Sequence, residues 1–145
     1  MGNFALIDVN NPPTKVDAEY FLLCDENCTL IGQELISRGI EKIKEFDVDF
    51  VYSDGFLSGT VDQPLYLPCF KPNLLDDNSI VINMPILTKA SLNVTIDSRL
   101  KQLKLLSLFK QLCSYYIGYH LAEFTYSVKN IYTGDIGREL KIING

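Results

Sequence analysis

The chain contains very little of the residue on which catalysis most often depends. It has one histidine, His120, and no tryptophan. Histidine-based chemistry within one chain usually needs a second histidine or a partner at a recognisable spacing, and neither is present. The chain also has no GxSxG elbow, no HExxH pair and no glycine-rich phosphate loop. These absences count against the hydrolase, metalloprotease and nucleotide-binding classes that those motifs mark.

Positive charge is also scarce. The chain has 13 Lys and Arg against 18 Asp and Glu, which gives a net charge of −5. A net negative field repels phosphates, and the lysines form no basic stripe, so we expect no nucleic-acid partner. An acidic chain is instead compatible with a basic protein as its partner.

Long hydrophobic runs are absent as well. No stretch reaches the roughly 20 apolar residues that a membrane helix needs, so we expect no membrane association. The N-terminal residues MGNFALIDVNNPP lack the basic region of a signal peptide, and we therefore expect a cytoplasmic protein.

The four cysteines do not form a recognisable metal site. Cys24 and Cys28 are not spaced as CxxC, and no second pair accompanies them, so we expect no metal and no cofactor. Buried, reduced thiols are the simplest interpretation of all four, and one or two disulfides are the alternative. The other two are Cys69 and Cys113.

The composition is that of an ordinary globular protein. With 145 residues, 47% of them hydrophobic, the chain predicts one domain over residues 1–145 with a single core. A strand is expected over Glu19–Leu23 and another over Ser79–Ile86. Asp54-Gly55 is typical of a hairpin turn within residues 47–60. Residues 125–132 and 136–143 predict a C-terminal hairpin around Thr133-Gly134-Asp135.

Two segments have helical spacing. Apolar residues recur at steps of three and four over residues 29–45, namely Ile31, Leu35, Ile36, Ile40 and Ile43. Residues 97–124 predict a longer, central helix. On that helix His120 shares the packing face with Leu112, Tyr116 and Leu121. The opposite face carries small or polar residues, Ser107, Gln111, Ser114 and Gly118.

These elements predict an α+β fold with a mainly antiparallel, curved sheet packed by two helices, because alternating βαβ units are absent.

Three functions remain open. The first is a non-enzymatic protein-binding module of the inhibitor, immunity or adaptor type, which acts through a tyrosine-rich surface. Its expected contact residues are Tyr115, Tyr119, Ser107, Gln111, Ser114 and Gly118. The partner is another protein, and a homo-oligomer is compatible with the same surface.

The second hypothesis is a small-ligand sensor or carrier. Its pocket would lie between the long helix and the sheet and be lined by Phe50, Tyr116 and His120. The third is a small enzyme that uses His120 or the acidic residues around the first hairpin. Those acidic residues are Asp47, Asp49, Asp54 and Asp62.

Overall fold

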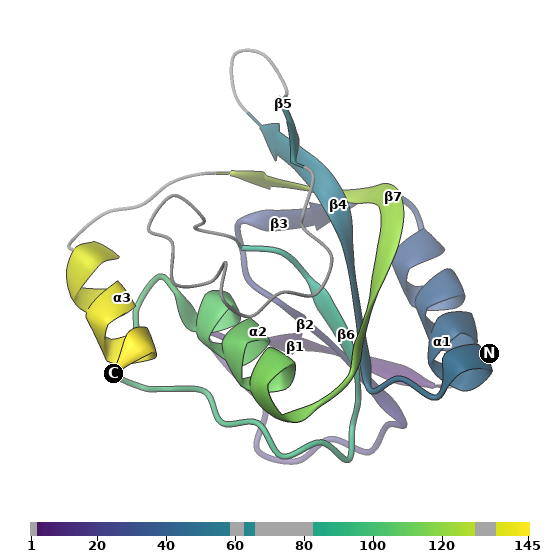
Figure 1. Cartoon of the computed structure of the whole chain (residues 1–145), viewed down its shortest axis with the longest axis horizontal. Helices are drawn as coiled ribbons and strands as arrows, with labels where there is room; N and C mark the ends of the chain where they lie inside the picture. Colours follow the sequence, from purple (N-terminus) through teal and green to yellow (C-terminus); the bar gives the residue numbers. More distant parts are fainter. Residues whose placement is uncertain (1–2, 59–62, 66–82, 130–135) are drawn as a thin grey trace.

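The computed structural model describes residues 3–58, 63–65, 83–129 and 136–145 (Figure 1). The described part has mixed α+β structure, with three helices and a strongly curled sheet. In chain order its elements are β1 (Phe4–Asp8), β2 (Tyr20–Cys24), β3 (Cys28–Leu30), α1 (Glu34–Phe46), β4 (Phe50–Ser58), β5 (Gln63–Leu65), β6 (Ile86–Lys89), α2 (Lys104–Tyr115), β7 (Gly118–Lys129) and α3 (Ile136–Asn144). The strand expected at Glu19–Leu23 is therefore confirmed as β2. Of the strand expected at Ser79–Ile86, residues 79–82 lie outside the described residues, and β6 begins at Ile86.

The sheet is mixed, so the expectation of a mainly antiparallel sheet is wrong. Its strand order is β1-β2-β6-β4-β7-β3, with β5 paired to β4 off this path. β1 is parallel to β2, and β4 is parallel to β7 in the longest register of the sheet. β4 and β7 run parallel because the chain crosses between them through β6 and α2 instead of turning directly back.

The turn expected at Asp54-Gly55 is also wrong, because β4 runs through both residues. Asp54 pairs with Phe124 and Gly55 pairs with Tyr126, and the register shifts on either side of Asp54. A Cβ on Gly55 would lie 2.4 Å from the Tyr126 ring. This glycine therefore permits a close approach of a side chain, where the hairpin interpretation assumed a positive φ angle. β4 does turn back, but later, into β5.

The long helix expected over residues 97–124 is shorter in the structure. α2 ends at Tyr115, and the next residue, Tyr116, is extended, with φ −134° and ψ 170°. β7 begins at Gly118 and pairs with β4 from Phe50 onward. Aromatic and β-branched residues dominate from Tyr115 to Tyr119, and these favour strands once a neighbouring strand is available. The predicted helix was too long because the apolar spacing after Tyr115 also fits the alternating side chains of a strand.

The start of α1 and the C-terminal segment of the chain also differ from expectation. Residues 28–30 form β3, which pairs with β7, and α1 begins only at Glu34. The second strand of the expected C-terminal hairpin is instead the helix α3. The turn expected at 133–135 lies outside the described residues. In α3, Ile136, Leu140 and Ile143 are spaced four and three apart and pack against the core, which explains the helix.

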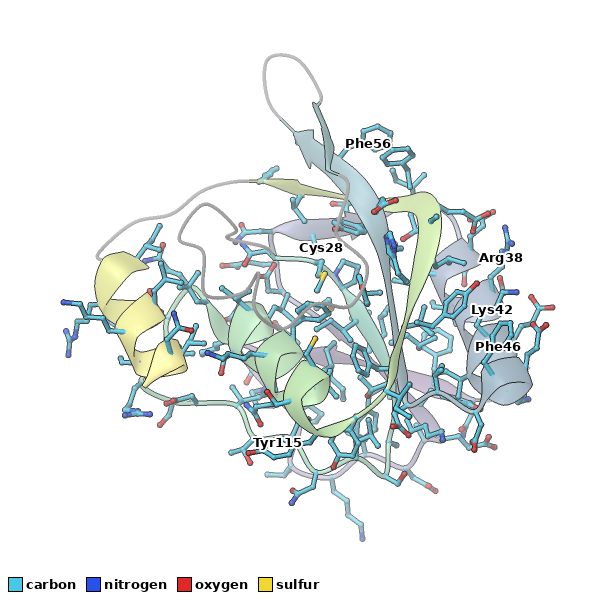
Figure 2. All side chains as sticks on the ribbon, in the orientation of Figure 1. Cys28, Arg38, Lys42, Phe46, Phe56 and Tyr115 are labelled. Atoms are coloured by element: carbon cyan, nitrogen blue, oxygen red, sulfur yellow. The ribbon has the colours of Figure 1, made fainter. Side chains whose placement is uncertain are left out.

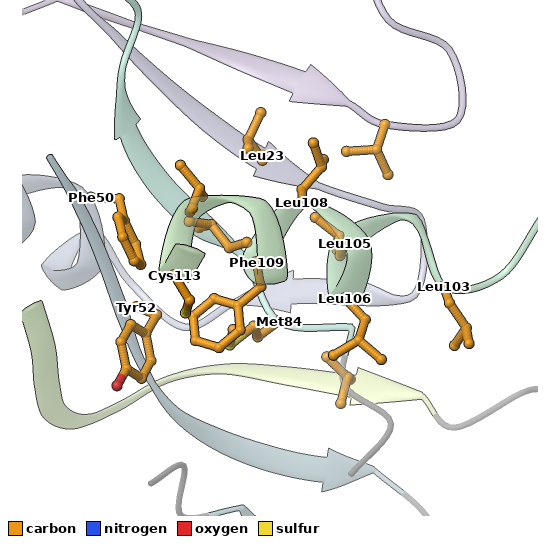
Figure 3. Packing of buried hydrophobic residues seen from close by; sticks show 14 of the residues in the cluster. Leu23, Phe50, Tyr52, Met84, Leu103, Leu105, Leu106, Leu108, Phe109 and Cys113 are labelled. Atoms are coloured by element: carbon orange, nitrogen blue, oxygen red, sulfur yellow. The ribbon is translucent and has the colours of Figure 1, made fainter. Parts of the chain in front are cut away.

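Two hydrophobic clusters lie on opposite faces of the sheet. α2 lies in the hollow of the curled sheet, where Phe109 contacts the rings of Phe50 and Tyr52 edge-on (Figure 3). α1 covers the other face, over Val51 of β4 and Leu121 of β7. Because side chains alternate along a strand, those of Phe50, Tyr52 and His120 lie on the α2 side of the sheet, and those of the adjacent residues in each strand lie on the α1 side. Within the described ranges, no helix has the length and apolar character needed to cross a bilayer.

Candidate functional site

Large apolar side chains are exposed where α1 ends and β7 begins. Phe46, the last residue of α1, is 52% exposed, and Ile117, just before β7, is 64% exposed. The half-buried Tyr119 ring stacks on Phe46, with ring centroids 5.4 Å apart and an angle of 9° between the planes. Ile117 and Tyr119 are two residues apart in an extended segment, so side-chain alternation puts both on the same side of that segment. We call Phe46, Ile117 and Tyr119 the Phe46 patch.

The backbone holds the Phe46 patch in place. The Asp49 N–H donates to the Ile117 carbonyl at 2.7 Å, and the Ile117 N–H donates to the Asp49 carboxylate at 3.0 Å. Asp47, directly after Phe46, has a left-handed backbone conformation with φ 53°, which ends α1. Both exposed side chains therefore sit on backbone that is fixed before any partner binds.

Charged side chains surround this patch. The ammonium of Lys42 lies 5.4 Å from the Phe46 ring centroid and 5.8 Å from that of Tyr119, and its nitrogen is 3.3 Å from a Glu45 carboxylate oxygen. Further along α1, Arg38 pairs with Glu123 of β7. Figure 2 shows Arg38, Lys42 and Phe46 following one another along α1. The arrangement is an apolar centre with a polar rim.

The two tyrosines predicted as contact residues, Tyr115 and Tyr119, differ from Tyr116 between them. Tyr115, at the end of α2, is 80% exposed (Figure 2), and Tyr119 belongs to the Phe46 patch. Tyr116 between them is half-buried, and its hydroxyl accepts a hydrogen bond from the Asn93 N–H at 3.0 Å. Tyr115 and Tyr119 thus lie at an exposed surface, whereas Tyr116 fixes a neighbouring segment.

The four small or polar residues expected on one helix face do not share a surface. Ser107 is buried, and Gly118 is in β7, where an added Cβ would lie 2.3 Å from the Phe50 ring. The Gln111 side chain bonds both backbone groups of Thr95, at 3.0 and 2.8 Å. Only Ser114 is exposed, and its hydroxyl donates to the Lys110 carbonyl at 2.8 Å.

Two of the residues expected to line a ligand pocket, Phe50 and His120, both lie beside the Tyr52 ring. Phe50 is fully buried, and the His120 ring stacks on Tyr52 with centroids 5.0 Å apart. His120 Nε2 lies 2.8 Å from a carboxylate oxygen of Asp54. No sequence spacing indicated this pair, because Asp54 was expected in a turn and His120 on a helix.

An Asp–His pair can orient an imidazole for acid–base work if a substrate reaches the ring. Here both side chains are largely buried, and neither is among the described residues that line the two hollows below. Burial raises the pKa of Cys24 to about 11 and the pKa values of Cys28 and Cys113 to about 12, so these free thiols are protonated at neutral pH. Across the described residues, no three His, Cys, Asp or Glu side chains are grouped as a metal site.

Described residues line two hollows that could hold a small molecule. One, of about 270 Å³, lies between α2, the segment 92–96 and the strands β1, β2 and β6. The other, of about 430 Å³, lies beside β1, β2 and β3 on the opposite face of the sheet and includes Asp8, Asp25 and Glu26. Burial raises the pKa of the Asp25 carboxyl, while its bond from the Asn27 N–H opposes that shift.

A comparison with models of known protein families finds no match for this chain, and a comparison with curated proteins finds none either.

Proposed function

We propose that this chain is a non-enzymatic protein-binding module that uses the Phe46 patch together with Tyr115. The observation that carries the proposal is the exposure of Phe46, Ile117 and Tyr115 by more than half on pre-ordered backbone. Clustered, exposed apolar residues mark interaction sites more often than isolated ones do. Aromatic residues are also enriched among those that dominate binding energy. An inhibitor, immunity or adaptor protein would use such a surface to hold its partner.

The partner we propose is a protein whose contact surface has an apolar side chain, the anchor, surrounded by basic residues. Ile117 and Phe46 are suited to contact the anchor, since both are more than half exposed and Phe46 is held against the Tyr119 ring. The basic surround would complement the net charge of −5, as well as Glu45 and Asp47 beside the patch. The cytoplasm, where such a partner would be met, is part of the proposal.

The test is affinity purification from the native source, with the variant Ile117→Lys compared with wild type. Leu6→Lys is a matched control, because Leu6 is 59% exposed on β1, away from the Phe46 patch. We expect a partner whose recovery falls at least roughly tenfold with Ile117→Lys and stays unchanged with Leu6→Lys. Binding of the purified partner, measured by calorimetry, should show the same ranking.

Two results would count against this proposal. Equal recovery of every partner with wild type and Ile117→Lys would remove the Phe46 patch from the binding surface. Concentration-dependent dimers in sedimentation equilibrium, lost with Ile117→Lys, would assign the patch to a second copy of this chain in place of a basic partner.

A further inference from the structure

The hollow between α2 and the sheet has no role in the proposed protein contact. The hollow has a volume of about 270 Å³ and lies under the segment 92–96, on the face of the sheet that α2 covers. We propose that this hollow, the α2 cavity, binds a small, uncharged, apolar molecule. The described residues that line it are Ile7, Pro13, Thr14, Val16, Phe21, Leu23, Thr88, Lys89, Leu92, Val94, Ile96 and Leu108.

The size of the α2 cavity sets the size of its ligand. Protein interiors are close-packed and hold few voids larger than a water molecule. An engineered apolar cavity of about 150 Å³ takes up benzene. A cavity of 270 Å³ therefore accommodates a molecule of about ten non-hydrogen atoms, aromatic or branched aliphatic in shape.

The lining sets the ligand's charge. Among the described lining residues, the polar ones are Thr14, Thr88 and Lys89. The Lys89 ammonium lies 3.5 Å from an Asp49 carboxylate oxygen and 3.6 Å from one of Asp47. It is thus already neutralised by two carboxylates, and an ionised ligand would enter an apolar site without a counter-ion. An uncharged ligand avoids that desolvation cost.

The segment 92–96 forms one wall of the α2 cavity, and three hydrogen bonds attach it to α2 and to Tyr116, the residue that follows α2. Gln111 makes two of them to Thr95, and the Tyr116 hydroxyl makes the third to Asn93. All three are solvent-exposed, so this wall can open at low cost compared with the core. Gln111 and Tyr116 are therefore positioning residues for this cavity.

Methyl-labelled full-length protein titrated with p-xylene and with indole, and followed by NMR, tests the proposal directly. We expect saturable shifts, with intermolecular NOEs to the methyl groups of Leu92, Val94, Ile96 and Leu108. Benzoate, similar in size but charged, should bind at least roughly tenfold more weakly. Absence of saturable shifts with both uncharged probes, or NOEs to the Phe46 patch instead, would overturn the proposal.

A cavity-filling variant provides the second arm. Val94→Phe should weaken p-xylene binding at least roughly tenfold, because the added ring occupies the space that the ligand needs. Ile31→Phe adds the same ring at an exposed position outside the cavity and should leave binding unchanged. Unchanged p-xylene affinity in a folded Val94→Phe variant would contradict the site. If that variant does not fold, the wild-type NOEs decide alone.

Discussion

Gly118 lies at the start of β7, directly against the ring of Phe50. A Cβ there would come within 2.3 Å of a buried aromatic ring that has no room to move. Gly118→Ala should therefore lower the free energy of unfolding by about 1–3 kcal/mol through overpacking. In a helix, the same change would raise it by about 1 kcal/mol. Urea denaturation gives the sign, and Ser114→Ala, on the exposed face of α2, should stay within about 0.5 kcal/mol of wild type.

Cys113 gives the protein a pH dependence on the alkaline side. Burial raises the pKa of this thiol from an ordinary value of 9.0 to about 12. Between these values the unfolded chain loses a proton that the folded chain keeps, so stability from this group is complete below pH 9 and falls as the pH rises. The unfolding free energy of wild type should thus fall more steeply from pH 9 to 11 than that of Cys113→Ala. Parallel slopes in denaturation series would contradict a buried thiol here.

At the scale of elements, α3 stabilises the start of α2. The buried Glu139 carboxylate accepts hydrogen bonds from the Lys101 and Gln102 N–H groups, at 2.6 and 2.8 Å. α2 has no side-chain cap of its own, since its N-cap residue is Leu103. A carboxylate near a helix N-terminus also interacts favourably with the positive end of the helix dipole.

Glu139→Ala should therefore destabilise the protein by about 1.5–3 kcal/mol, the range for hydrogen bonds to a charged group. Glu139→Gln should lose less, because its amide oxygen can still accept one of these bonds. Thermal or urea unfolding measures both, with Lys141→Ala as the control on the exposed side of α3. Equal losses for Lys141→Ala and Glu139→Ala would show that the carboxylate contacts contribute nothing.

The sequence predicted some helices and strands better than others. α1 and β2 were found because their apolar spacing fits one period and their neighbours do not alter it. The end of α2 was placed too late because residues 116–121 fit two periods, and residues 136–143 were predicted as a strand because so short a segment fits either period. Tyr115 and Tyr119 were expected from the sequence to contact a partner, and that expectation stays a prediction. Phe46 and Ile117 were missed because exposure of an apolar residue depends on what the fold leaves uncovered.

At the scale of the whole molecule, the parallel pairing of β4 with β7 should make folding slow. Phe50 pairs with Gly118, so the chain must close a long loop before these strands gain any contact. We expect refolding on the order of milliseconds to seconds, as for other folds with mostly non-local pairing. Stopped-flow fluorescence of the tyrosines measures this rate. Relaxation within microseconds in a temperature jump would be incompatible with this topology.

The amino-acid sequence alone determined the α+β class, the acidic charge and the presence of α1, because each depends on composition or on one local period. The prediction of a single domain over residues 1–145 also comes from length and stays a prediction. Only the tertiary structure decided the mixed sheet, the strand at Gly118 to Phe124, the Asp54–His120 pair and the Phe46 patch. The reason is physical: strand pairing and exposure depend on residues that are distant in the chain, and a local pattern carries no record of them.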